Sequence, residues 1–259
     1  DWVLENTLTF KTSKNEKHNF SLMGGMTIEY GKYETVIASK MNVPNNADYM
    51  RYLSAATSDA NIESSVSDYA LVSYLGRFNY SFKSKYILTA SYRVDGSSKF
   101  ASSNKWGYFP SVSAGWRVSN EKFFDLLHAN TIFDDLKIRL GWGQVGNQNI
   151  SDNSFRTIIT GGNTNRYIFD NTIYQGYSPS NVGNKTIKWE TTESTNLGLD
   201  FVMFKNKLSG SIDIFNKKTK NMLLKLPVPI SVGLSESPWA NAGTVLNKGI
   251  EVYTNYHSK

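Results

Sequence analysis

The chain has 259 residues, 40% hydrophobic and 14% aromatic, so it can bury a core and is not intrinsically disordered. It contains no cysteine, which excludes disulfide bridges, zinc–thiolate sites and thiol nucleophiles. The formal charge is +6, but the lysines are spread beside expected turns instead of forming one basic face, so we expect no nucleic acid partner. A mean hydropathy of −0.39 and the lack of a long apolar run exclude a transmembrane helix, but not a membrane-spanning barrel of alternating strands.

Apolar and polar residues alternate with period 2 through most of the chain, which predicts β-strands with one apolar and one polar face. Two weaker strands open the chain, and a last one closes it. The predicted strands are, in chain order, about 2–11, 18–30, 74–82, 86–95, 112–119, 136–143, 197–203, 208–215 and 247–257. We therefore expect an all-β fold of about nine antiparallel strands, each joined to the next as a hairpin.

The expected connections differ in length at the two ends of these strands. Short turns are predicted near 12–17, 83–85 and 204–206, and long connections at about 31–68, 97–105, 147–190 and 218–246. A small helix is expected at 121–127, on the short-turn side. Structureless loops of this length are rare in compact soluble domains. Short turns at one end and long loops at the other are typical of a transmembrane barrel, and a β-sandwich with short loops at both ends fits less well.

The strand faces follow from the alternation. Aromatic side chains near strand ends suit the membrane–water boundary, and these are Tyr86, Trp106, Tyr108, Trp116 and Trp142. The residues predicted to point to lipid are Tyr80, Leu88, Trp116, Leu140 and Leu199. Those predicted to point to the lumen are Asn79, Thr89, Arg117, Arg139 and Asp200, and the polar wall as a whole comprises Arg77, Asn79, Arg93, Arg117, Lys137 and Arg139.

The motifs in the sequence give little evidence for a catalytic or cofactor-binding site. Gly141–Gly146 matches G-x-G-x-x-G, but the Asn-rich continuation is not a helix that could hold a pyrophosphate. Arg93 and Asp95, two residues apart, are expected to form a structural salt bridge. We expect no catalytic residue, no cofactor and no metal site.

The long loops offer the better ligand candidates. The segment 147–190 is rich in Asn, Thr, Ser and Gly with aromatic rings between them, which suits a neutral polar ligand such as an oligosaccharide or a peptide. The candidate ligand-binding residues are Phe155, Tyr167, Phe169, Tyr174, Tyr177 and, in the next long loop, Trp239. Ordinary loop composition explains any single one of them equally well.

Several blocks between residues 70 and 251 resemble the SusC/RagA family of TonB-linked outer-membrane transporters. They include Tyr-Leu-Gly-Arg-Phe-Asn-Tyr at 74–80, Tyr-Arg-Val-Asp-Gly-Ser-Ser-Lys-Phe at 92–100, Trp-Gly-Tyr-Phe-Pro-Ser-Val-Ser-Ala-Gly-Trp-Arg at 106–117 and Ile-Arg-Leu-Gly-Trp-Gly-Gln-Val-Gly-Asn-Gln at 138–148. Further blocks begin at Ile187, Asn216 and Asn241, in the family's order. The first 68 residues resemble the family only in their general strand pattern and share none of these blocks.

The resemblance implies a 22-stranded barrel with a plug inside it, in the outer membrane of a Gram-negative bacterium. It also implies a SusD-like surface lipoprotein as partner, TonB as the energy source through the plug, and glycans or peptides as substrate. The plug and the final strands are expected to lie outside residues 1–259, which would be a partial barrel domain whose edge strands need neighbours. A soluble all-β carbohydrate-binding module and a passive porin are the alternatives.

Overall fold

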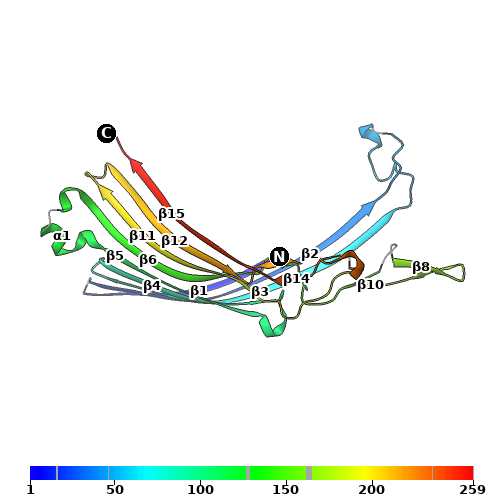
Figure 1. Ribbon diagram of the computed structural model, residues 1–259, viewed down its shortest axis with the longest axis horizontal. Coiled ribbons are helices and arrows are strands. Elements are labelled where there is room, and N and C mark those ends of the chain that lie inside the picture. The colour runs from blue at the N-terminus through cyan, green and yellow to red at the C-terminus, as the bar shows by residue number, and fades with distance from the viewer. Residues whose placement is uncertain (16, 46, 127–128, 162–164, 235, 259) are drawn as a thin grey trace.

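The computed structural model describes residues 1–258 except 16, 46, 127–128, 162–164 and 235. Its centre is one sheet of nine antiparallel strands, in which each strand pairs with the next strand of the same sheet in chain order (Figure 1). The strands of this main sheet are β1 (Trp2–Lys14), β2 (His18–Ser39), β3 (Asn61–Phe82), β4 (Tyr86–Ser97), β5 (Trp106–Arg117), β6 (Phe133–Asn147), β11 (Glu190–Met203), β12 (Leu208–Lys220) and β15 (Thr244–Tyr256). The predicted all-β, up-and-down arrangement is confirmed.

The two ends of the main sheet differ as predicted. Tight turns join β1 to β2, β3 to β4 and β11 to β12 at one end, where α1 (Lys122–Leu126) also lies between β5 and β6. Lys83 and Ser84 both have positive φ, 49° and 54°, which matches a type I′ hairpin turn and the right-handed twist of its strands. We call this end the short-turn end and the opposite one the loop end.

The long connections at the loop end carry small elements of their own. These are the two-stranded pairs of β7 (Ile159–Thr160) with β10 (Ser178–Pro179), β8 (Arg166–Phe169) with β9 (Thr172–Gln175), and β13 (Leu223–Lys225) with β14 (Trp239–Asn241). Short 3-10 turns lie in these connections at Asp48–Met50, Ser102–Asn104 and Ile230–Val232, and two more, Val118–Asn120 and Ala129–Thr131, flank α1 at the short-turn end. The β8–β9 hairpin projects away from the sheet (Figure 1).

The predicted loop at 31–68 is wrong at both ends, because only residues 40–60 lie between the two strands. β2 continues to Ser39 and β3 begins at Asn61, and the two strands stay paired from His18 opposite Phe82 to Ser39 opposite Asn61. β1 reaches only Tyr30 and β4 only Leu71, so residues 31–39 and 61–70 form a two-stranded arm that rises above the sheet. Both faces of this arm are largely exposed, so its sequence lacks the apolar alternation by which the other strands were predicted.

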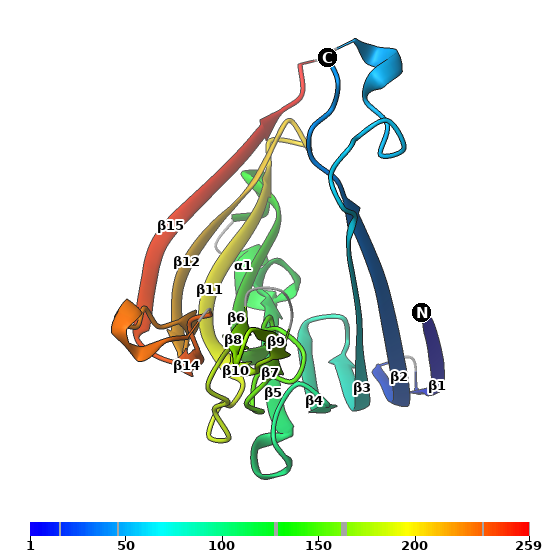
Figure 2. The same ribbon diagram turned by 90° about the vertical axis from the view of Figure 1, so that its right-hand side faces the viewer.

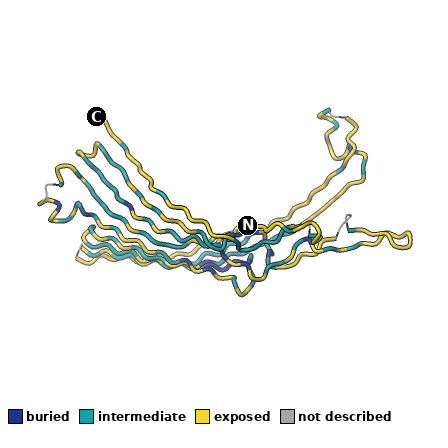
Figure 3. Tube along the Cα trace, in the orientation of Figure 1, coloured by how far each residue is buried: buried dark blue, intermediate teal, exposed yellow. Residues whose placement is uncertain are grey.

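The main sheet is strongly curved, and its strands follow an arc from β1 to β15 (Figure 2). Within the described residues, β1 and β15 each pair with one strand only, so the sheet is open at both edges. Buried residues gather where the loops meet the strands (Figure 3). No helix within the described part of the chain is long and apolar enough to cross a membrane.

Candidate functional site

The register of the main sheet sorts its side chains into one apolar and one polar face, because directly opposed residues share a face. On the apolar face, one cross-strand row contains, in order, Tyr80, Leu88, Ala114, Leu140 and Leu197. Trp116 and Leu199 belong to the same face, since both lie opposite Ile138. The five residues predicted to point to lipid therefore share one face.

The six residues predicted for the polar wall lie together on the opposite face. Asn79 lies opposite Thr89, and Arg117 lies opposite Lys137. Arg77 and Asn79 come from β3, Arg93 from β4, Arg117 from β5, and Lys137 and Arg139 from β6. Basic and amide groups of four neighbouring strands thus form one continuous polar surface.

A network of ion pairs balances the basic residues nearer the short-turn end. Arg139 donates from Nε and Nη2 to Asp200, at 2.7–3.0 Å, and from Nη2 to Asp213 at 3.0 Å. Lys137 Nζ lies 3.8 Å from Asp200, and Arg117 Nε lies 3.4 Å from an Asp135 oxygen. Three cations thus face three carboxylates, so this part of the wall is polar but nearly neutral.

A glycine makes the longest of these contacts possible. Arg139 on β6 and Asp213 on β12 both lie directly opposite Gly198, on the strand between them. A Cβ atom at Gly198 would lie 2.6 Å from both Arg139 Nη2 and Asp213 Oδ1. The guanidinium therefore reaches its second carboxylate across β11 because residue 198 has no side chain.

Arg93 has a fixed orientation nearer the loop end. Its Nε donates to both carboxylate oxygens of Asp95, at 2.8 and 3.0 Å, and its Nη2 donates to Ser73 Oγ at 2.9 Å. Asp95 and Ser73 are buried, whereas the arginine side chain remains partly open to the polar face. The predicted Arg93–Asp95 salt bridge is confirmed.

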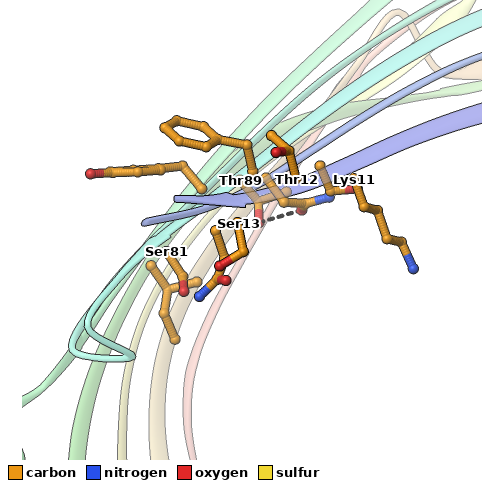
Figure 4. A pocket seen from close by; sticks show the side chains of 11 residues that line it. Lys11, Thr12, Ser13, Ser81 and Thr89 are labelled. Carbon is orange, nitrogen blue, oxygen red and sulfur yellow. Dashed lines mark hydrogen bonds between the residues drawn. The ribbon is translucent and has the colours of Figure 1, made fainter. Parts of the chain in front are cut away.

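The polar surface of the described residues has several hollows, of which two are candidate ligand sites. The larger one, of about 710 Å³, contains Arg93, the paired hydroxyls of Ser91 and Ser111, and the rings of Phe109 and Trp189. The other, of about 520 Å³, lies towards the short-turn end between β1 and β4 (Figure 4). There the Thr89 hydroxyl donates to the Asn79 side-chain oxygen at 2.9 Å. Hydroxyl, amide and guanidinium groups beside flat rings suit a ligand rich in hydroxyl or amide groups.

A buried cluster fixes the loops above the larger hollow. We call it the rim cluster, and it consists of Phe100, Phe109, Ile150, Ile187, Trp189 and Leu223. Its residues come from three successive connections and from β5, whose ladder with β6 covers only Ser111–Arg117. The indole nitrogen of Trp189 donates to the Lys105 carbonyl at 3.1 Å. The cluster thus joins three loops into one packed unit.

Lys99 adds a polar clamp to this unit. Its Nζ donates to the Ile150 carbonyl at 3.0 Å, lies 3.4 Å from an Asp152 oxygen and stands 5.3 Å from the centre of the Tyr69 ring. Ser67 donates to the other Asp152 oxygen. The base of the connection between β6 and β11 is therefore held against β3.

The six predicted loop residues separate into different environments. Phe155 and Trp239 pack against the rim cluster. Tyr167, Phe169 and Tyr174 share one face of the β8–β9 hairpin, where the two tyrosine rings stack at 5.7 Å between centroids. Tyr177 is 72% exposed. The structure therefore does not bring all six residues to one place.

Glu121 accepts hydrogen bonds from three side chains at the short-turn end. It accepts hydrogen bonds from the Tyr86 hydroxyl at 2.7 Å, Trp116 Nε1 at 3.2 Å and Lys85 Nζ at 3.2 Å. These hydrogen bonds, that of Tyr86 first, lower the pKa of Glu121. At the loop end of the apolar face, Trp142 Nε1 donates to Glu193 at 3.1 Å. The sequence reasoning missed these carboxylate partners and the rim cluster, because strand alternation does not link a strand residue to a connection or to a distant strand.

Comparisons with known proteins agree with this architecture. A family profile described as "TonB dependent receptor-like, beta-barrel" matches residues 2–257. TonB-dependent receptor P26 of Formosa agariphila is 32% identical over 98% of this chain and 25% of its own length, and TonB-dependent receptor SusC of Bacteroides thetaiotaomicron is 37% identical over 71% and 18%. The chain thus spans about a quarter or less of the length of these curated relatives.

Solved structures show the same fold. The structure of the RagAB peptide transporter superposes with a TM-score of 0.81 at 29% identity, over 98% of this chain and 27% of that one. The siderophore receptor PirA from Pseudomonas aeruginosa shares the fold at 15% identity with a TM-score of 0.56, over 96% of this chain and 38% of its own. TonB-dependent receptors are outer-membrane β-barrel proteins of Gram-negative bacteria and form a transporter and receptor family. The chain belongs to this family of TonB-dependent receptor β-barrels, as its resemblance to SusC and RagA predicted.

Proposed function

We propose that residues 1–259 form part of the barrel wall of an outer-membrane transporter that imports glycans or peptides. The observation that carries this proposal is the continuous division of nine neighbouring strands into an apolar and a polar face. The apolar face would contact lipid. The polar wall of Arg77, Asn79, Arg93, Arg117, Lys137 and Arg139 would line the lumen. In this role the chain is a passage for its substrate and not an enzyme.

The open sheet supports a larger barrel. Each unpaired backbone group costs several kcal/mol in lipid, so an open sheet edge cannot lie in the hydrocarbon. β1 and β15 would therefore pair with further strands of the polypeptide, which would also supply the plug and its contact with TonB. This reading makes residues 1–259 one portion of a barrel domain.

The loop end supports binding of substrate and partner. The larger hollow combines hydroxyl groups, a guanidinium and two aromatic rings, which suits sugars and peptide backbones alike. Tyr167, Phe169, Tyr174 and Tyr177, held at or near the projecting hairpin, would contact the substrate or a SusD-like surface lipoprotein. Phe155 and Trp239 would support this contact from the rim cluster.

Uptake by cells that carry the full-length receptor tests the proposal. Either labelled oligosaccharides or labelled peptides should enter the wild type, and entry should stop in a deletion strain and after addition of a protonophore. Uptake that persists without proton-motive force would instead indicate a passive porin. Extraction of the protein in soluble form without detergent would indicate the soluble module.

A matched pair of variants connects uptake to the hollow. Ser111→Trp would fill the larger hollow from the polar face, so it should reduce uptake. Val112→Trp places the same ring on the apolar face, where aromatic residues are common, and should leave uptake unchanged. Equal uptake by the two variants would contradict the assignment of the hollow to the substrate path.

A further inference from the structure

Charged side chains are distributed unevenly over the apolar face of the main sheet. None of the described apolar-face residues that pair within the sheet is charged on β3 from Val72 onwards, or on β4, β5 and β6. On β11, β12 and β15, the same face carries four charged residues, all towards the loop end. They are Glu193, Lys218, Lys220 and Lys248.

The register places these charges just beyond the apolar band. The last fully apolar row across these strands contains Leu140, Leu197, Ile214 and Ile250. The next row contains Trp142 and Lys248, the one after it Glu193 and Lys218, and the third Lys220. Successive rows lie about 7 Å apart along a strand. The lysines therefore begin at the height of an interfacial tryptophan.

The local charge is positive. Lys220 Nζ lies 2.8 Å from a Glu193 oxygen, and Trp142 donates to the other oxygen of that carboxylate. Lys218 lies opposite Glu193 in the ladder but forms no salt bridge among the described residues, and neither does Lys248. Both are exposed. One carboxylate thus faces three ammonium groups, which leaves a net charge of about +2.

We propose that Lys218, Lys220 and Lys248 bind the phosphate of an anionic lipid headgroup in the leaflet at the loop end. The inference rests on the proposed placement of the apolar face in lipid. Lysine stems extend along apolar surface while their ammonium groups reach the headgroup layer. Basic residues beside a membrane attract anionic headgroups, and each such residue increases the affinity about fivefold. Trp142 marks the boundary at which the headgroup phosphates would lie.

Lipid binding to the detergent-purified, full-length receptor tests this site. The probes are dioleoyl phosphatidic acid and dioleoyl phosphatidylcholine, titrated separately and counted as bound lipids by native mass spectrometry. The wild type should bind phosphatidic acid at least tenfold more tightly than phosphatidylcholine. Excess inorganic phosphate should not displace the lipid. Displacement at equal concentration would indicate a site for free phosphate and overturn the lipid assignment.

Three variants test whether these lysines cause the preference for phosphatidic acid. Lys218→Gln/Lys220→Gln/Lys248→Gln should lose most of the preference for phosphatidic acid, and the corresponding triple arginine variant should keep it. Lys217→Gln removes a neighbouring lysine on the opposite face and should bind lipid as the wild type does. A triple glutamine variant that keeps the preference overturns the site. A wild-type receptor that is monodisperse without detergent overturns the membrane placement itself, so the two failures are distinguishable.

Discussion

The indole nitrogen of Trp116 donates a hydrogen bond to Glu121 Oε1 at 3.2 Å, which ties the end of β5 to the segment that leads into α1. The Tyr86 hydroxyl donates to the same oxygen, and Lys85 contacts the other. An aromatic ring near the membrane boundary can keep its apolar body in lipid only if its polar tip has a partner. Glu121 supplies that partner to two rings from neighbouring strands.

Glu121→Gln should therefore lower the stability of the full-length receptor at neutral pH. The pKa of Glu121 is lowered in the folded state, so the unfolded chain takes up this proton first as the pH falls below the ordinary value of 4.5. The stabilisation is present above that pH and is lost as the pH falls through the lowered pKa. Thermal unfolding in detergent should give a lower melting temperature for the variant than for the wild type at neutral pH, and this difference, or gap, should close in acid. A gap independent of pH would contradict the role of the charge.

The division of faces makes adjacent residues respond differently to one substitution. Leu88 lies on the apolar face, whereas Thr89 lies on the polar face in the smaller hollow. An arginine facing lipid costs about 2–4 kcal/mol at the bilayer midplane. Leu88→Arg should impair assembly of the receptor far more than Thr89→Arg, as measured by its heat-modifiable migration on gels. Equal tolerance of the two changes would contradict the assigned faces.

The main sheet was predictable from the sequence because its faces differ in chemistry. Apolar residues such as Tyr80, Leu88 and Leu140 occupy every second position over the central part of their strands. The same rule fails for the arm at 31–39 and 61–70. Val36 and Ile37 are both exposed although they lie on opposite faces, so the arm has no apolar side that the alternation could reveal.

The rim cluster could not be predicted for a different reason. Ile150, Ile187 and Trp189 are apolar residues within one polar connection, and they meet Phe100 and Leu223 only after three connections pack together at the loop end. The alternation relates neighbours within one strand, whereas in this cluster Phe100 meets Ile150 and Ile187, which follow it by 50 and 87 positions in the sequence. The loop aromatics could be recognised by type, but not sorted into supporting and exposed groups.

Trp189 should be the residue on which the order of these loops depends most. It packs against Phe100 and Phe109 and is 7% exposed. Truncation of a buried tryptophan to alanine costs about 3–5 kcal/mol. Trp189→Ala should thus make the 148–189 connection sensitive to limited proteolysis. Tyr177→Ala in the same connection removes an exposed ring and should not change the cleavage pattern; equal cleavage of both variants would argue against a packed rim.

Gly198 should control the ion pair between Arg139 and Asp213. A methyl group at residue 198 would occupy the space through which the guanidinium passes, 2.6 Å from both partners. Gly198→Ala should therefore displace Arg139 from Asp213 and destabilise the barrel by about 1–2 kcal/mol, since the arginine is partly open to water. Gly141→Ala is the matched control, because its new Cβ would have only Ser113 Cβ, at 4.0 Å, as a neighbour. A double-mutant cycle of Arg139→Gln with Asp213→Asn should give a coupling free energy in the wild-type background that disappears in the Gly198→Ala background. If the coupling persists beside alanine, the bridge does not need the glycine.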